Sequence, residues 1–126
     1  MNYLETFSGY SVDSLDAAET FYRDTLGFTT ARTKEGALDV ETPSQHVFLY
    51  EKSSHRPAEF TVFNLVVSDI DSGVSDLKAK GITFEMYDGM HQDEQGIARG
   101  KNVGMGPDIA WFKDPAGNII SVLAKA

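Results

Sequence analysis

Apolar residues recur every three or four positions between Asp13 and Gly27, which is the spacing of one buried face of an α-helix. Leu15 and Leu26 lie near the two ends of this apolar stripe. Asp13 or Ser14 can accept hydrogen bonds from the free amides at the start of a helix, and the glycine that ends the segment suits the left-handed position after its last turn. The pattern therefore predicts a helix that packs on a hydrophobic core.

A second stretch with the same period runs from Asp69 to Lys80, with Asp69 as the predicted cap. Its apolar stripe consists of Ile70, Val74 and Leu77. The other patterned segments are short and rich in β-branched and aromatic side chains, which is typical of strands. We expect strands at residues 4–12, 28–33, 37–41 and 46–51 around the first helix, and at 60–67, 82–87, 108–113 and 118–123 around the second.

Both halves of the chain thus consist of one strand, one helix and three further strands, which is an internal repeat of architecture. Strands and helices mixed in this order belong to the α+β class. We predict one domain of two tandem βαβββ modules whose sheets form a shared trough. The first module covers about residues 1–52, a linker that contains Pro57 covers about 53–58, and the second module covers about 59–126.

The stretch from Asp88 to Pro107 interrupts this pattern, because it contains five glycines and no apolar period. Irregular stretches of this length are uncommon inside a compact domain and are usually functional or disordered. Two interpretations stay open for it: a lid that covers a ligand, or a flexible surface insertion.

Composition narrows the class of partner. The chain has 126 residues, no cysteine and a formal net charge of −8. Without cysteine it can form neither disulfides nor zinc–thiolate sites, and its acidity argues against nucleic acid or an anionic membrane surface as the main partner. No apolar run is long enough to span a membrane and the first residues lack a secretory signal, so we expect a cytoplasmic protein.

Three motifs resemble one known family. The run Phe21–Phe28 (FYRDTLGF) resembles the end of the first helix in the glyoxalase / bleomycin-resistance / dioxygenase group, also called the vicinal-oxygen-chelate superfamily. The run Asp114–Asn118 (DPAGN) resembles the penultimate turn of that group, and residues 77–82 resemble the end of its second helix. The resemblance implies the βαβββ repeat and a small-molecule ligand. It also makes a homodimer plausible, because relatives often pair their modules across two chains.

Metal-dependent members of this superfamily hold a divalent cation with His, Gln or Glu at four inward-facing strand positions. Counted from the nearest motif, these positions fall at Phe7, Leu49, Val62 and Ser121 in this chain. Three of these side chains are hydrocarbon, and a lone serine hydroxyl is a poor ligand for cations that need several carboxylate or imidazole groups at once. We therefore expect no metal and no other cofactor.

A register shift of one or two residues would leave room for a displaced divalent metal site. The side chains that could then act as ligands are Glu5, His46, Glu51 and His91. Each also has an ordinary structural interpretation, because strand ends and loops commonly carry solvated acids and histidines.

Apolar residues at the metal positions make the floor of the trough apolar, as in pockets that bind small organic molecules. The predicted ligand-binding residues are Phe7, Leu49, Val62, Asn64, Trp111 and Ser121. The first hypothesis is a metal-independent protein that binds an aromatic or cationic compound, like the bleomycin-resistance branch. The alternative is an enzyme, either a glyoxalase-like lyase or isomerase or a dioxygenase, that uses the displaced metal. A third hypothesis is a non-enzymatic subunit for a protein partner. Whether Trp111 or Phe112 faces the trough stays open.

Overall fold

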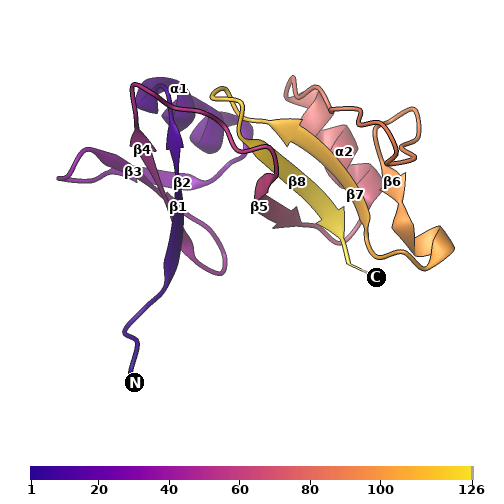
Figure 1. Ribbon diagram of the computed structural model, residues 1–126, viewed down its shortest axis with the longest axis horizontal. Helices are drawn as coiled ribbons and strands as arrows, with labels where there is room; N and C mark the ends of the chain where they lie inside the picture. The colour runs from indigo at the N-terminus through magenta and orange to yellow at the C-terminus, as the bar shows by residue number, and fades with distance from the viewer. Residues whose placement is uncertain (126) are drawn as a thin grey trace. The chain divides into compact units, whose positions relative to one another are not determined.

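The computed structural model describes residues 1–125. The chain forms two compact units, Met1–Pro57 and Ala58–Ala126, which we call module 1 and module 2 (Figure 1). Each module contains one mixed four-stranded sheet and one α-helix that contacts it. The α+β class and the two tandem modules are therefore confirmed, while the shared trough stays a prediction.

Module 1 follows the predicted order of one strand, one helix and three strands. Its sheet has the order β1-β4-β3-β2, in which β1 and β4 are parallel and the other neighbours are antiparallel. The first and last strands of the module are thus hydrogen-bonded neighbours. The elements are β1 Phe7–Val12, α1 Leu15–Thr20, the π-helical turn η1 Phe21–Thr25, β2 Thr29–Arg32, β3 Ala37–Glu41 and β4 His46–Glu51.

The predicted first helix is present, but its period changes half-way. Ser14 caps α1, because its side-chain oxygen accepts a hydrogen bond from the Ala17 amide at 3.2 Å. After α1 the turns widen to π-helical spacing, and the chain leaves the helix through Gly27, whose φ of +80° suits glycine. Tyr22 in the widened turn is fully buried, and its hydroxyl lies 2.7 Å from that of Tyr10 on β1.

The face of the first sheet that packs on α1 is apolar. In β4, Val47 and Leu49 are buried. The residues that alternate with them, His46, Phe48 and Tyr50, keep part of their surface accessible. This period of two is the signature of a sheet with one face on a core. The buried hydrophobic residues of module 1 are Val12, Leu15, Ala18, Tyr22, Leu38, Val40, Val47 and Leu49.

Module 2 repeats the strand order of module 1. Its sheet has the order β5-β8-β7-β6, with β5 and β8 parallel and the other pairs antiparallel. Each strand thus takes the place of its counterpart in module 1, as the internal repeat predicts. The elements are β5 Thr61–Val66, α2 Ile70–Ala79, β6 Ala98–Arg99, the 3-10 turn η2 Gly100–Val103, β7 Asp108–Lys113 and β8 Ile119–Ala124.

The second helix begins at the predicted cap. The Asp69 carboxylate accepts hydrogen bonds from the Ser72 amide at 3.0 Å and from the Ser72 hydroxyl at 2.6 Å. Within residues 1–125, no helix combines the length and the apolar composition needed to cross a membrane. The buried cluster beneath α2 consists of Ile70, Val74, Ile97, Ala110, Val122 and Ala124.

The strand predicted at residues 82–87 is wrong, because this segment forms no ladder. It makes one backbone hydrogen bond to β7, from the Glu85 amide to the Trp111 carbonyl oxygen at 2.8 Å. The amide of Tyr87 instead donates to the side-chain oxygen of Gln92 at 2.7 Å. The Gln92 side chain therefore takes the place of a neighbouring strand as the partner of the Tyr87 amide.

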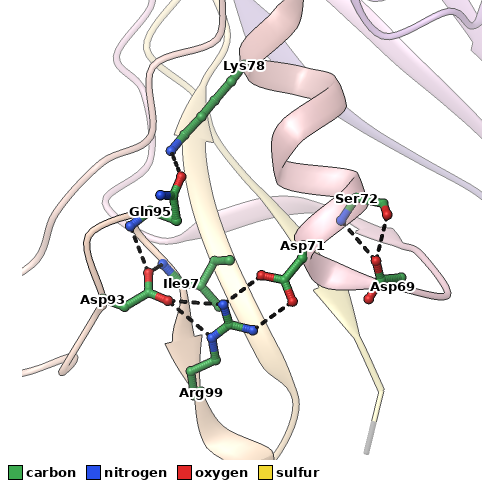
Figure 2. Close-up of polar contacts among 8 residues, drawn as sticks. All are labelled: Asp69, Asp71, Ser72, Lys78, Asp93, Gln95, Ile97 and Arg99. Carbon is green, nitrogen blue, oxygen red and sulfur yellow. Dashed lines mark hydrogen bonds and ion pairs between the residues drawn. The ribbon is translucent and has the colours of Figure 1, made fainter.

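The stretch 88–107 is fastened to α2 by a polar network (Figure 2). Arg99 donates to the Asp71 carboxylate on α2 at 2.7 Å and 3.1 Å, and its Nε donates to Asp93 at 3.1 Å. Asp93 also accepts from the amides of Gln95 and Ile97, each at 2.9 Å. These contacts anchor residues 93–99, and the interpretation of the whole stretch as a flexible surface insertion stays a prediction. The lid interpretation stays a prediction.

Candidate functional site

Each sheet has a second face that turns away from its helix. In module 1, strand pairing sets Phe7 beside His46 and Gly9 beside Phe48 on this face. The rings of Phe7 and Phe48 contact each other, with centroids 4.8 Å apart. Because Phe7 is 56% exposed, the two rings form an accessible aromatic surface.

His46 supplies the polar group of this surface. Its Nδ1 lies 2.8 Å and 3.0 Å from the two carboxylate oxygens of Asp39 on β3. The hydrogen bond with Asp39 raises the pKa of His46, the negative charge of that carboxylate adds to the effect, and desolvation opposes it. The carboxylate also fixes the ring orientation, which leaves Nε2 to meet a proton, a ligand or a metal.

Leu49 does not belong to this face, contrary to the expectation for the trough. It is fully buried and pairs with Tyr10 and Leu38 on the side that packs on α1. Phe48 is the β4 residue that shares a face with Phe7, so the register counted in β4 is one residue off. A shift of one residue moves a side chain to the opposite face of a sheet.

In module 2 the corresponding face carries a row of three predicted site residues. Strand pairing sets Ser121 on β8 between Asn64 on β5 and Trp111 on β7. The Ser121 hydroxyl is buried and donates to the Asn64 side-chain oxygen at 2.5 Å. The structure therefore brings together Asn64, Trp111 and Ser121.

The facing of Trp111 and Phe112 follows from the same pairing. Phe112 pairs with Ile120, is fully buried and meets Phe84 edge-to-face at a centroid distance of 5.7 Å. Trp111 points to the other side, beside Ser121. Of the two rings, Trp111 is the one on the face away from α2.

Val62 lies at an irregular point of β5. The pairing of β5 with β8 shifts between Thr61 and Phe63, which is a β-bulge. Thr61 pairs with Ile119 and Phe63 with Ile120, so Val62 is the inserted residue. Counting from a motif by strict alternation therefore fails at this position.

Trp111 lines a pocket of about 270 Å³ in module 2. Tyr87 stands against it edge-to-face, with ring centroids 5.7 Å apart and planes inclined at 75°. This volume is just below the range of about 300–1,000 Å³ common for ligand pockets, so a small ligand is expected. The other lining residues are Glu59, Phe60, Thr61, Asp88, Met90 and Ile119.

The hydroxyl of Tyr87 is buried and has no hydrogen-bond partner within residues 1–125. Burial raises the pKa of Tyr87, and the negative charge of Glu85 acts in the same direction, so the phenol is neutral at physiological pH. A buried polar group without a partner costs about 1–3 kcal/mol. The unpaired hydroxyl therefore costs stability at this pocket.

Of the residues that line this pocket, only Trp111 was predicted from the sequence as a ligand-binding residue. Phe60 gave a signal as an aromatic residue at the start of a predicted strand, and it is 68% exposed. Tyr87 and Asp88 gave none, because the segment before residue 88 was assigned to a strand. On the first sheet, Asp39 was missed because an acid in a strand has no local signature.

The residues at the four counted metal positions do not fit a metal ion. Phe7 and Val62 have hydrocarbon side chains, and Leu49 is a hydrocarbon buried on the helix side. Ser121 offers a single neutral hydroxyl oxygen, which is a poor ligand without carboxylate or imidazole groups beside it. Divalent cations need several oxygen or nitrogen ligands at one point, which these four residues do not provide.

The fallback candidates are divided between the two modules, and one of them has a structural role. The Glu51 side chain accepts a hydrogen bond from the Leu15 amide at 2.9 Å, so it caps α1. Glu5 is exposed before β1, and His91 is exposed in the loop of module 2, with a φ of +51°. Within residues 1–125, no three side chains of His, Cys, Asp or Glu are close enough to hold one metal ion.

The sequence matches the family described as Glyoxalase/Bleomycin resistance protein/Dioxygenase superfamily over residues 3–122. The chain belongs to this superfamily. A comparison with curated proteins finds no match.

Several solved structures of the superfamily fold are similar along the full chain. A superfamily member from Sphaerobacter thermophilus has 23% identity and a TM-score of 0.69, covering 98% of each chain. Lactoylglutathione lyase from Agrobacterium tumefaciens has 22% identity and a TM-score of 0.65, covering 98% of this chain and 96% of the other. An antibiotic-binding protein from a Streptomyces species has 20% identity and a TM-score of 0.67, covering 100% of both. The similar structures thus include an enzyme and a binding protein, and at these identities they show the fold alone.

Proposed function

We propose that this protein binds an aromatic or cationic small molecule without a metal ion. The observation that supports this proposal is the pocket of module 2, which is lined by the edge-to-face pair of Trp111 and Tyr87. Aromatic faces hold flat ligands by stacking and cations through the ring quadrupole. The similarity to an antibiotic-binding protein supports a binding role for the fold.

Metal independence rests on the chemistry of the counted positions. Phe7 and Val62 offer no donor atom, and Ser121 offers only one neutral hydroxyl, which is a poor ligand by itself. A superfamily reaction that uses a metal to polarise an oxygen pair needs that cation. With these residues we expect binding without turnover.

The test is a ligand screen read by tryptophan fluorescence. Trp111 is the only tryptophan of the chain and lines the pocket, so its emission reports occupancy directly. Aromatic and cationic compounds are titrated into chelator-treated protein and into protein supplied with divalent metal. We expect saturable changes with the same affinity in both. Binding that requires metal, or no response to any compound, would contradict the proposal.

A specific observation keeps a displaced metal site as the second candidate. His46 is oriented by Asp39, as metal-binding histidines commonly are by a carboxylate. The stripped protein is loaded with Ni, Zn, Mn or Fe(II), desalted and submitted to elemental analysis. About one metal per chain, lost in His46→Ala, would make the glyoxalase-like enzyme the leading function. We expect no retained metal.

We further propose a homodimer, because relatives pair their modules across chains. Light scattering should then give about twice the chain mass of 13.9 kDa. A mass equal to that of one chain would contradict the dimer without affecting the pocket.

A further inference from the structure

Three aromatic side chains line the pocket of module 2. Tyr87 and Trp111 pack edge-to-face, with ring planes at 75° and centroids 5.7 Å apart, and both line the pocket. Trp111 is 9% exposed, and Phe60 adds a third lining ring that is 68% exposed. A cation within about 6 Å of such ring faces is attracted by their quadrupoles.

Charge in the same pocket has one sign. Glu59 and Asp88 contribute carboxylates, and none of the described lining residues is a lysine, arginine or histidine. Lys113, the one basic residue of β7, forms an ion pair with Glu85, with Nζ and Oε1 3.7 Å apart. The pocket therefore favours a positive charge and repels an anion.

The walls also restrict what kind of cation can bind. Met90 and Ile119 offer hydrocarbon surface, and the Thr61 hydroxyl is the uncharged polar group besides Tyr87. The carboxylates can accept hydrogen bonds from any ammonium, but the three aromatic rings and the apolar side chains of Met90 and Ile119 leave a larger surface for methyl groups on the nitrogen than for N–H donors. Aromatic rings combined with carboxylates form the usual recognition surface for alkylated ammonium groups.

We propose that this pocket recognises an alkylated ammonium cation, such as a trimethylammonium group on a small organic body. This rests on the proposed function and narrows the ligand from the aromatic or cationic class to one headgroup. Trp111 and Tyr87 contact the methyl groups, and the carboxylates of Glu59 and Asp88 supply the long-range attraction.

The test uses three probes that share a two-carbon alcohol, of which the first two are nearly equal in size. Choline carries the trimethylammonium group, 3,3-dimethylbutan-1-ol replaces its nitrogen with carbon, and ethanolamine carries a primary ammonium. Each is titrated into the full chain at constant ionic strength, with Trp111 emission as the readout. We expect choline to bind at least tenfold more tightly than either of the other two probes.

Variants assign the effect to the pocket. Glu59→Gln combined with Asp88→Asn should weaken choline binding at least fivefold and leave 3,3-dimethylbutan-1-ol unchanged. Glu35→Gln is the matched control, because Glu35 is an exposed acid in a turn of module 1. Circular dichroism checks that each variant is folded. Equal losses of affinity for choline and for 3,3-dimethylbutan-1-ol would overturn the proposal. The carboxylates would then affect the shape of the pocket and not its attraction for a positive charge.

The outcomes separate this proposal from the proposed function. If the neutral isostere binds as tightly as choline, the headgroup assignment is wrong and the binding function stands. The same holds if none of the three probes binds while other compounds of the aromatic and cationic screen do. If no compound in either set changes the Trp111 emission, both proposals fail.

Discussion

The two modules share one topology but use the face opposite their helix differently. In module 1 this face is open, with Phe7 56% and Tyr50 50% exposed. In module 2 the equivalent face carries Trp111 at 9% and Ser121 at 0%, and the ring of Tyr87 packs against the tryptophan.

The difference lies in the connection that follows each helix. In module 1 the chain passes from η1 to β2 through Leu26, Gly27 and Phe28. In module 2 it takes residues 80–97 to reach β6, and this length brings Tyr87 and Asp88 to the sheet. The longer connection thus supplies the second sheet with a ring and a carboxylate that have no counterpart in module 1.

The largest expected effect concerns the two faces of the first sheet. Leu49→Ala should destabilise the protein by about 2–5 kcal/mol, because it removes a fully buried side chain from the core beneath α1. Phe7→Ala should cost about 1 kcal/mol, mainly the ring contact with Phe48. Chemical denaturation measures both values. A cost for Phe7→Ala equal to that of Leu49→Ala would mean that the face assignment is inverted.

The next effect tests the anchor of the module 2 loop. Arg99→Ala should lower the free energy of unfolding by about 1–2 kcal/mol, because it leaves Asp93 and Asp71 without their shared partner. This figure allows for the solvent screening of a partly exposed ion pair. Hydrogen exchange at the Ile97 amide should accelerate. Arg23→Ala is the control, because Arg23 pairs with its exposed neighbour Asp24. If both variants exchange like wild type, the network does not hold the loop.

A smaller effect distinguishes two tyrosine hydroxyls. Tyr22→Phe should destabilise the protein by about 1 kcal/mol, because it removes the bond of 2.7 Å to the Tyr10 hydroxyl. Tyr87→Phe should be neutral or slightly stabilising, since that hydroxyl is buried without a partner. Thermal unfolding of the two variants gives the comparison. A clear loss for Tyr87→Phe would reveal a partner that the apo structure lacks.

The smallest effect is a pH dependence specific to module 1. The folded pKa of His46 is raised above its ordinary 6.5 by Asp39. The associated stability is therefore fully present below the unfolded pKa and is lost as the pH rises through the folded one. Asp39→Asn should return the NMR-measured pKa of His46 toward 6.5 and flatten this dependence. Glu35→Gln serves as control, and an unchanged His46 titration in Asp39→Asn would contradict the assigned cause.

The sequence predicted the parts of the fold that depend on local signals. The bounds of β3, β4 and β7 agree with the expected strands, because turn residues flank each of them. Ser14 and Asp69 cap the two helices as expected, since side-chain capping is a local interaction. The repeat was predicted correctly, although its second strand in module 2 is β6, Ala98–Arg99, and not the segment 82–87.

The errors arose where a residue's environment is set by distant parts of the chain. The β4 sequence HVFLYE is apolar on both faces, so its period could not show that Leu49 faces α1. The run IAWF in β7 is ambiguous in the same way until Trp111 is paired with Ser121. Tyr87 lies at the pocket in a segment whose backbone bonds to Gln92 and to Trp111, contacts that no local pattern encodes.

The parallel pairing of β1 with β4 and of β5 with β8 has a consequence for biosynthesis. In each module the first strand pairs with the last one. The sheet therefore cannot be completed until the whole module has left the ribosome. Such non-local pairing slows folding, because the loop entropy is lost before the contacts form. Module 1 can complete its sheet while module 2 is still being translated. Removal of the final strand, β8, would leave β5 with no partner and an open edge that invites aggregation.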